Sequence, residues 1–395
     1  MPATKQAYEN KNLNICTERL EFLDTVIERF YKENYRHAFI VRAHRYGVPI
    51  YECNIGENVL PSGLHQNTIS RFFSCTKPII GALMLKLQED ALIDFVEAVH
   101  FYLPEFGGEG TRDICIWHLL THSSGMEDAH FDNYYKSYIR DILGIKELSE
   151  EATEEEEEEY NKKVNIALGL SEDASYMDKS LKLIEGYKPA HKPRELMSYF
   201  NLGYNLLGHI IKKVTGKSLE EYATEVLFRP LGMNDSHFFV PKEKLDRVLI
   251  RKEGTMSYPW INEQYAFNHD HGAGGLKSTV IDMCKFADMV VAGGTIDGYR
   301  FLSPASIKAM SRNFNPDINS DFDAWSLGWN YHGTKKDDAG ILRSENCLEH
   351  GGWAGHKILA DPDTGLTCAI ITGEYDPPGR NLFGHINNVL CSALD

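Results

Sequence analysis

The chain has 395 residues, with 41 Lys and Arg against 57 Asp and Glu, which gives a formal net charge of −16 and a pI near 5.5. Nucleic-acid binding draws its affinity from clustered basic side chains, so this charge balance excludes a protein that tracks phosphates. A hydrophobic content of 43% at this length is typical of a globular chain with room for two sub-domains. No run of 18 or more apolar residues occurs in the sequence, so we expect no contact with a membrane.

The N-terminus and the cysteines bear on the cellular location. Residues 1–22 lack the basic start, apolar stretch and small-residue cleavage site of a secretory signal, so we expect a cytoplasmic protein. The eight cysteines are scattered from Cys16 to Cys391 without a C-x-x-C pair, and a chain of this size needs no disulfides to fold. We therefore expect reduced thiols, most of them in the core.

The first elements predicted along the chain are a helix and a hairpin. Apolar residues recur at helical spacing in residues 18–32. Two apolar, β-branched runs follow at 38–43 and 48–55, and the four residues between them offer Gly47 for a positive φ. A long and mostly buried helix is then predicted to begin at Ser74.

The middle of the chain is predicted to be rich in helices, at residues 112–121, 205–214, 219–227 and 280–291. Strands are predicted again at 356–360 and 366–372, before a last helix at 382–394. Because the strands lie at both ends of the chain, the order predicts an α/β architecture of the α+β type. We expect one α/β domain from residues 1–105 and 275–395, and an inserted, mostly helical domain at 106–274.

An acidic insertion near residues 147–160 interrupts the helical domain. It contains six consecutive glutamates, Glu154–Glu159. Mutual repulsion at this charge density is typical of an exposed, mobile loop or of a helix end. A docking patch for a basic partner is the alternative.

A single S-x-x-K sequence, Ser74-Cys-Thr-Lys77, suggests a nucleophile with its base. On a helix, a serine and a lysine three positions apart project from one face within contact distance. The helix start also favours negative charge on the serine oxygen, and burial would lower the pKa of Lys77 enough for it to act as a base. Taken alone, the pattern is more often an N-capping serine followed by a surface lysine.

Two further motifs follow in chain order, Tyr199-Phe-Asn201 and His350-Gly-Gly352-Trp353. Together with the S-x-x-K sequence they resemble the serine β-lactamase and penicillin-binding-protein superfamily, whose members carry S-x-x-K, Y-x-N and a third K-T-G or H-x-G motif in this order. The pattern is most similar to class C β-lactamases and the related family VIII esterases. The resemblance extends from about residue 38 to residue 372, with further matching stretches at 117–126, 227–233, 274–279 and 302–306.

The resemblance implies a β-lactamase-like fold, in which an antiparallel sheet is flanked by helices, and an acyl-enzyme formed on Ser74. It implies that Tyr199 and Lys77 share the role of base, deprotonating Ser74 and then protonating the leaving group. The amide of Asn201 would help to hold Lys77 and would meet the acyl side of the substrate. The stretch between His122 and Tyr199 is longer than is usual in such proteins, and it would form a lid or an acyl-chain wall.

The third motif is implied to lie on a strand that lines the pocket, where Gly352 allows a close backbone approach. The backbone N–H groups of Ser74 and Trp353 would form the oxyanion hole. His350 stands where β-lactamases and transpeptidases place the lysine that holds the substrate carboxylate, and K-[ST]-G occurs nowhere in the chain. Histidine is only partly charged near neutral pH, which favours ester or neutral amide substrates over β-lactams. A structural His350, hydrogen-bonded behind the strand, is the alternative.

We therefore expect a cytosolic serine hydrolase of the esterase type that acts on a small-molecule ester or amide without a metal or cofactor. The enzymatic alternatives are a β-lactamase or D-alanyl peptidase, a D-amino-acid amidase or peptidase, and an acyltransferase that uses the same site. A scaffold or binding protein that kept the fold is the non-enzymatic alternative. Zinc on His118 and His122 is a weaker hypothesis because the glutamate of H-E-x-x-H is missing, and a metal at residues 269–271 has no stronger support. The oligomeric state is left open.

Overall fold

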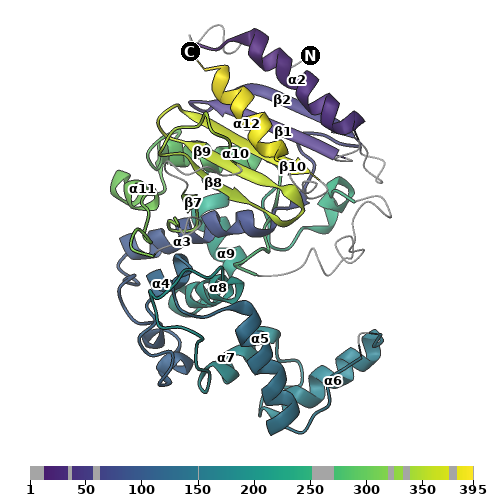
Figure 1. Ribbon diagram of the computed structural model, residues 1–395, viewed down its shortest axis with the longest axis vertical. Coiled ribbons are helices and arrows are strands. Elements are labelled where there is room, and N and C mark those ends of the chain that lie inside the picture. The colour runs from purple at the N-terminus through teal and green to yellow at the C-terminus, as the bar shows by residue number, and fades with distance from the viewer. Residues whose placement is uncertain are drawn as a thin grey trace.

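A six-stranded antiparallel sheet forms the centre of one half of the molecule (Figure 1). The computed structural model describes residues 13–33, 38–56, 63–149, 151–250, 271–318, 324–331, 339–372 and 380–394. The strands lie in the order β2-β1-β10-β9-β8-β7, so β1 from the N-terminal part pairs with β10 from the C-terminal part. Their bounds are β1 Ala38–Arg45, β2 Val48–Gly56, β7 Asn330–Tyr331, β8 Leu348–Gly351, β9 Lys357–Asp361 and β10 Leu366–Thr372. The α+β fold class predicted from the sequence is confirmed, whereas the domain limits at 105/106 and 274/275 stay predictions.

The hairpin between β1 and β2 has a tighter turn than the sequence predicts. His44 and Arg45 continue β1, and only Tyr46 and Gly47 form the turn, with φ of 50° and 74°. Two successive positive φ values match the twist of a two-residue hairpin, so the prediction of a positive φ at Gly47 is confirmed. A register shift between Ala43 and His44 accommodates the turn.

Alternate residues of the strands belong to two separate hydrophobic cores, one on each face of the sheet. Phe39 and Val41 face the core formed with α2 (Thr17–Lys32) and α12 (Leu382–Ser392). Ile40 and its neighbours on β9 and β10 face the larger core, which also contains residues of α10 (Val280–Val291) and of the helices between residues 116 and 223, here called the helical half. This alternation follows from the period of two in a strand. The predictions for 280–291 and 366–372 coincide with α10 and β10.

Helix α3 (Thr76–Glu89) lies between the sheet and the helical half and belongs to both (Figure 1). Almost all of its residues are buried. At Gly81, a Cβ atom would overlap the carbonyl oxygen of Leu327, and at Gly328 it would overlap that of Lys77. The absence of side chains at these two positions therefore allows the segment before β7 to approach the backbone of α3 directly.

The helical half contains more helices than the sequence predicts. Residues 112 and 113 lie in a turn and Cys115 forms an isolated β-bridge with Ala98, so the helix predicted at 112–121 is limited to α4. The helix predicted at 219–227 consists of α9 followed by a π-helical turn, Thr224–Phe228. Three helices between 128 and 184 were not predicted, although α7 (Tyr176–Ile184) carries local signals in its capping box, Ser175 with Asp178, and its buried Leu181 and Ile184. The bounds are α4 Ile116–Leu120, α5 Asp128–Ser137, α6 Glu154–Ala167, α7 Tyr176–Ile184, α8 Asn201–Thr215 and α9 Leu219–Ala223. Helix α11 (Pro304–Met310) contacts α3 and lies beside the sheet (Figure 1). Within the described ranges, no helix has the length and apolar character needed to cross a bilayer.

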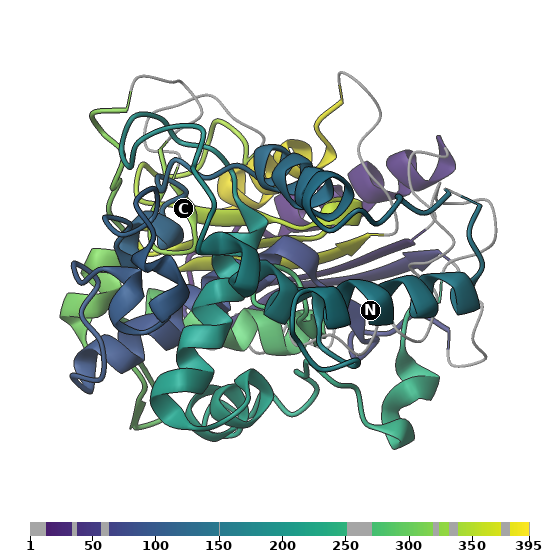
Figure 2. The same cartoon turned by 90° about the horizontal axis from the view of Figure 1, so that it is seen from below.

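The acidic run Glu154–Glu159 forms the first turns of α6. Thr153 caps this helix by accepting a hydrogen bond from the backbone N–H of Glu156 at 3.3 Å. Negative charge at a helix N-terminus is favourable, which explains how such a run can be helical. The run is thus a helix end, one of the forms expected from the sequence. Figure 1 shows that α6 extends from the end of the helical half that lies away from the sheet and α3, and Figure 2 views the molecule from that end. The acidic turns themselves do not cover α3, and the lid or acyl-chain wall expected of the stretch between His122 and Tyr199 stays a prediction.

The close approach at Gly81 can be tested against a second helical glycine. In Gly81→Ala, the new methyl group meets the fixed carbonyl of Leu327, and we expect the free energy of unfolding to fall by about 1–3 kcal/mol. In Gly208→Ala on α8, the nearest atom would be the flexible Leu219 Cδ2 at 3.4 Å, and we expect no loss or a gain of up to about 1 kcal/mol. Urea denaturation of both variants measures the difference. Equal effects would contradict the packing of α3 described above.

Candidate active site

Ser74 lies in a 3-10 turn, Phe73–Cys75, that immediately precedes α3 and is not part of the α-helix itself. Phe73 has a φ of 48°, a left-handed conformation that bulky residues rarely adopt. Its ring packs edge-on against Trp353, with 5.4 Å between ring centroids. The Thr76 hydroxyl donates to the Phe73 carbonyl at 2.6 Å and accepts from the N–H of Leu276 at 3.1 Å. These contacts hold a strained turn directly before Ser74.

Lys77 is fully buried, and its amine has three hydrogen-bond acceptors. Nζ donates to Ser74 Oγ at 3.2 Å, to Asn201 Oδ1 at 2.9 Å and to the carbonyl oxygen of Ala273 at 2.9 Å. Burial lowers the pKa of Lys77 to about 7, although the negative charge of Asp128 acts in the opposite direction. A substantial fraction of Lys77 is therefore neutral near pH 7, and a neutral amine next to Ser74 Oγ can accept its proton.

Asn201 is oriented by Asp128, a residue that the sequence did not identify. The Asn201 amide Nδ2 donates to Asp128 Oδ2 at 2.8 Å, which turns Oδ1 towards Lys77. The same carboxylate accepts the backbone N–H groups of Asn201 at 3.0 Å and of Leu202 at 3.3 Å, and so caps the start of α8. Asp128 begins α5, far away in the sequence, and no local motif marks it.

Tyr199 lies at the mouth of the site, two residues before α8. The residue is 37% exposed, and its ring centroid is 4.6 Å from Lys77 Nζ. Burial of the hydroxyl raises the pKa of Tyr199 above its ordinary value, while its hydrogen bond with Ser74 acts in the opposite direction. Tyr199 is thus protonated near neutral pH and contacts Ser74 as a neutral phenol.

The third motif lies against the Ser74 turn. His350 ends the buried part of β8, and the Cys75 thiol donates to its carbonyl oxygen at 3.2 Å. At Gly352, a Cβ atom would overlap the carbonyl oxygen of Phe72, so this position requires glycine. Trp353 follows directly and packs on Phe73. The structure thus brings Trp353 close to the turn of Ser74, and the oxyanion hole formed by their N–H groups stays a prediction.

His350 is a neutral, buried imidazole that faces the site. It is 3% exposed, and its ring lies 5.5 Å from Trp325 and 6.5 Å from Tyr199, measured between centroids. Because Nδ1 lies 2.8 Å from the carbonyl oxygen of Gly351, Nδ1 carries the proton and donates it. Burial and the nearby Lys77 lower the pKa of His350 to about 3. His350 is therefore hydrogen-bonded within its own strand, as the structural alternative expects, and its role in substrate binding stays a prediction.

The histidines considered as metal ligands serve as hydrogen-bond acceptors. Nδ1 of His118 accepts the N–H of Cys115 at 3.0 Å, and Nδ1 of His122 accepts the N–H of Phe200 at 3.0 Å. Helix α4 ends at Leu120, so the two rings do not lie on one helix face. His269 and Asp270 lie outside the described residues. Elsewhere in the described part of the chain, no three His, Cys, Asp or Glu side chains cluster as metal ligands would. The eight cysteines are all free thiols, four of them buried.

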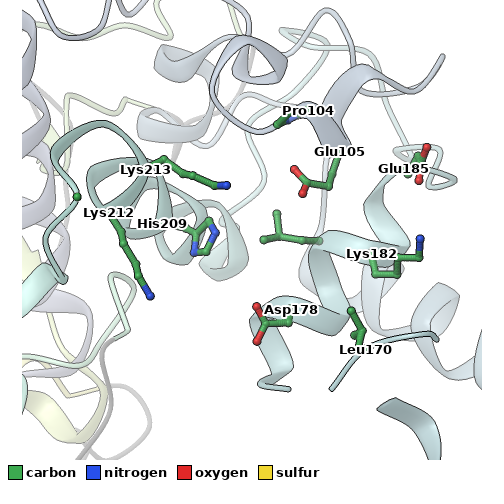
Figure 3. A pocket seen from close by; sticks show the side chains of 11 residues that line it. Pro104, Glu105, Leu170, Asp178, Lys182, Glu185, His209, Lys212 and Lys213 are labelled. Carbon is green, nitrogen blue, oxygen red and sulfur yellow. The ribbon is translucent and has the colours of Figure 1, made fainter. Parts of the chain in front are cut away.

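A separate cleft of about 820 Å³ lies at the other end of α8 (Figure 3). His209, Lys212 and Lys213 of α8 form one wall, while Glu105 and Asp178 face them from the segment after α3 and from α7. Asn201 and Lys213 are twelve positions apart, which corresponds to roughly 18 Å along a helix. The cleft contains none of the site residues predicted from the sequence.

Comparison with known proteins identifies the family of this chain. The family model for beta-lactamase matches residues 44–386. The N-acetylmuramyl-L-alanine amidase of Bacillus subtilis (strain 168) is 27% identical over 202 residues, which cover 46% of this chain and 45% of that protein. The chain spans about half the length of the curated relatives that it matches.

Two solved structures share the fold over almost the whole chain. A penicillin-binding protein homologue from Caulobacter crescentus has a TM-score of 0.71 at 17% identity, and a family VIII carboxylesterase has a TM-score of 0.70 at 18% identity. Each covers 96% of this chain and is itself covered to 99%. The β-lactamase-like fold expected from the motifs is therefore confirmed. Because the family model also spans Ser74, Lys77, Tyr199 and the third motif, the chain belongs to the beta-lactamase family.

Proposed function

We propose that this protein is a serine hydrolase that cleaves ester bonds, or neutral amides, through an acyl-enzyme on Ser74. The observation that carries this proposal is the buried Lys77 amine, 3.2 Å from Ser74 Oγ and with a pKa of about 7. A serine becomes an effective nucleophile only when a base beside it takes its proton. The membership in the beta-lactamase family and the fold shared with a family VIII carboxylesterase support the same chemistry.

In the proposed reaction, neutral Lys77 removes the proton of Ser74 as Oγ attacks the substrate carbonyl carbon. The oxyanion of the tetrahedral intermediate accepts hydrogen bonds from the N–H groups of Ser74 and Trp353. When the C–O bond to the leaving group breaks, the Tyr199 hydroxyl protonates the departing alcohol, and the Lys77 ammonium returns a proton to Tyr199. Water then attacks the acyl-enzyme, with the same pair as base, and releases the acid and Ser74.

The neutral charge of His350 supports uncharged substrates over substrates that carry a carboxylate. A β-lactam or a D-alanyl peptide carries a carboxylate, and a cation at the third motif would be needed to hold it. A histidine with a pKa of about 3 supplies no positive charge at physiological pH. Uncharged acyl substrates avoid the cost of placing a carboxylate beside a neutral ring, so we favour them over β-lactams.

The nucleophile and the substrate class are tested together in one set of assays. We expect wild type to hydrolyse short-chain p-nitrophenyl esters faster than a chromogenic cephalosporin or D-alanine p-nitroanilide. In Ser74→Ala, ester hydrolysis should fall by at least about 10³-fold, because the covalent route is lost. The initial rates of release of p-nitrophenol, cleaved cephalosporin and p-nitroaniline measure these differences.

The outcomes of these assays separate the alternatives. Equal rates for wild type and Ser74→Ala on every substrate would refute the assignment of the nucleophile. Efficient cephalosporin or D-alanine p-nitroanilide turnover would favour a β-lactamase or a peptidase. Transfer of the acyl group to an added alcohol, measured as the new ester, would identify an acyltransferase. A folded wild type without any turnover would favour a binding protein.

The pH dependence tests Lys77 as the base. Only neutral Lys77 can accept a proton, so kcat/KM should rise with pH, with a midpoint near the Lys77 pKa of about 7. Asp128 raises the pKa of Lys77, and its neutralisation in Asp128→Asn should therefore move this limb to lower pH. Ester hydrolysis measured from about pH 5 to pH 9 checks both statements. A limb that stays in place or moves to higher pH in Asp128→Asn would contradict them.

A further inference from the structure

His122 lies in the segment that follows α4, and its ring packs against the ring of Tyr199. Its side chain is buried, and its ring centroid lies 4.4 Å from that of Tyr199, 4.7 Å from that of Trp325 and 5.1 Å from that of Tyr204. Tyr199 is 37% exposed, so a rigid neighbour on its buried side limits where the ring can move. From the sequence alone, His122 is a candidate only for a zinc ligand.

Two hydrogen bonds tie the residues on either side of Tyr199 to His122. The backbone N–H of Ser198 donates to the His122 carbonyl oxygen at 2.9 Å. The backbone N–H of Phe200 donates to His122 Nδ1 at 3.0 Å. One residue therefore fixes the backbone before and after Tyr199, while its ring packs on the Tyr199 ring itself.

The protonation state of His122 suits this arrangement. Nδ1 accepts the Phe200 N–H, so the imidazole is neutral and carries its proton on Nε2. Burial, together with Lys77 and His350, holds the pKa of His122 well below its ordinary value. The acceptor at Nδ1 therefore persists through the neutral pH range.

His122 also carries two unfavourable features. Its φ of 56° is left-handed, and its Nε2 is buried without a hydrogen-bond partner among the described residues. A strained backbone costs on the order of 1–3 kcal/mol, and an unsatisfied buried donor costs about as much. Such costs persist where the surrounding structure demands one arrangement, and they concentrate at functional sites.

We propose that His122 is a positioning residue that holds Tyr199 beside Ser74 and Lys77, in the place from which its hydroxyl protonates the leaving group. The inference rests on the proposed function, since it assigns a role to Tyr199 in acylation. It predicts that loss of the His122 acceptor lowers the acylation rate of the folded enzyme and leaves the substrate affinity nearly unchanged. A misplacement of about 1 Å at a reacting group can cost roughly 100-fold in rate.

Two substitutions distinguish the effect of the His122 hydrogen-bond acceptor from the effect of its aromatic ring. In His122→Asn, the side-chain Oδ1 takes the place of Nδ1, and asparagine tolerates a positive φ. In His122→Phe, an aromatic ring is kept and the acceptor for Phe200 is lost. We expect kcat for p-nitrophenyl esters to fall by about 10–100-fold in His122→Phe with KM within about threefold of wild type, and the asparagine variant to recover most of the loss.

His118→Phe is the matched control. His118 Nδ1 likewise accepts a backbone N–H at 3.0 Å, and its ring packs on Trp117, away from Ser74, Lys77 and Tyr199. We expect this variant to lose stability, measured as the thermal midpoint, while its kcat per folded molecule stays near wild type. An equal fall of kcat in His118→Phe and His122→Phe would overturn the proposal, and so would wild-type kcat in His122→Phe.

Two readouts independent of ester turnover distinguish this proposal from the proposed function. Labelling of Ser74 by a fluorophosphonate, followed over time, should be slower in His122→Phe than in wild type and His118→Phe. If wild type and Ser74→Ala both remain unlabelled, the proposed function fails. In proteins labelled with ¹³C-tyrosine, the ring signal of Tyr199, assigned with Tyr199→Phe, should then still shift in His122→Phe and stay unchanged in His118→Phe. An unshifted Tyr199 signal in His122→Phe would refute the positioning role.

Discussion

The burial of a single amine, that of Lys77, organises this molecule. A charged ammonium taken out of water is expensive unless hydrogen bonds replace its hydration. Here three acceptors do so, and they come from separate parts of the chain: Ser74 from the turn before α3, Asn201 from α8, and the Ala273 carbonyl from the segment leading to β4 (Lys277–Ser278). The part of the desolvation cost that these hydrogen bonds do not offset lowers the pKa of Lys77. A lowered pKa is what the proposed role of this amine as a base requires.

Bringing three segments around one amine requires close backbone contacts, and glycines permit them. Gly81 and Gly328 bring the segment before β7 against α3, and Gly352 brings the third motif against Phe72. Strand β3 (Ser70–Arg71), shortly before Ser74, pairs antiparallel with β4, shortly after Ala273. This pairing brings the two segments together. The left-handed Phe73 then turns the chain into α3. Ser74 thus lies where the sheet, α3 and the helical half meet.

The charges around the site follow one pattern, in which the two histidines near Lys77 are uncharged. His350 and His122 are both held neutral by burial and by the proximity of Lys77. The carboxylate of Asp128 lies behind Asn201, which is hydrogen-bonded to both Asp128 and Lys77, and the negative charge of Asp128 raises the pKa of Lys77. The acidic turns of α6, which contribute to the net charge of −16, lie at the far end of the helical half. The proposed proton transfers therefore take place beside neutral histidines, and His350 of the third motif supplies no charge to hold an anion.

Sequence alone was sufficient wherever a local rule decides the outcome. The hairpin at Gly47, helix α10 and strand β10 follow from turn chemistry and periodicity, which operate over a few residues. The order of the motifs was enough to recognise the family, and it named Ser74, Lys77, Tyr199, Asn201, His350, Gly352 and Trp353, which the structure brings together. Helix α6 was missed because its first turns are almost entirely glutamate and lack an apolar period, whereas α7 was missed despite a capping box at Ser175 and apolar residues at helical spacing.

Tertiary structure alone decided the partners and protonation states of these residues. Asp128 reaches Asn201 across 73 positions, and His122 reaches Phe200 across 78, so no local pattern could have revealed either contact. The same holds for the neutral His350 and the lowered pKa of Lys77, because a pKa depends on burial and neighbouring charge, which exist only once the chain is folded. Residue types and their order are properties of the sequence, whereas desolvation and distance are properties of the fold.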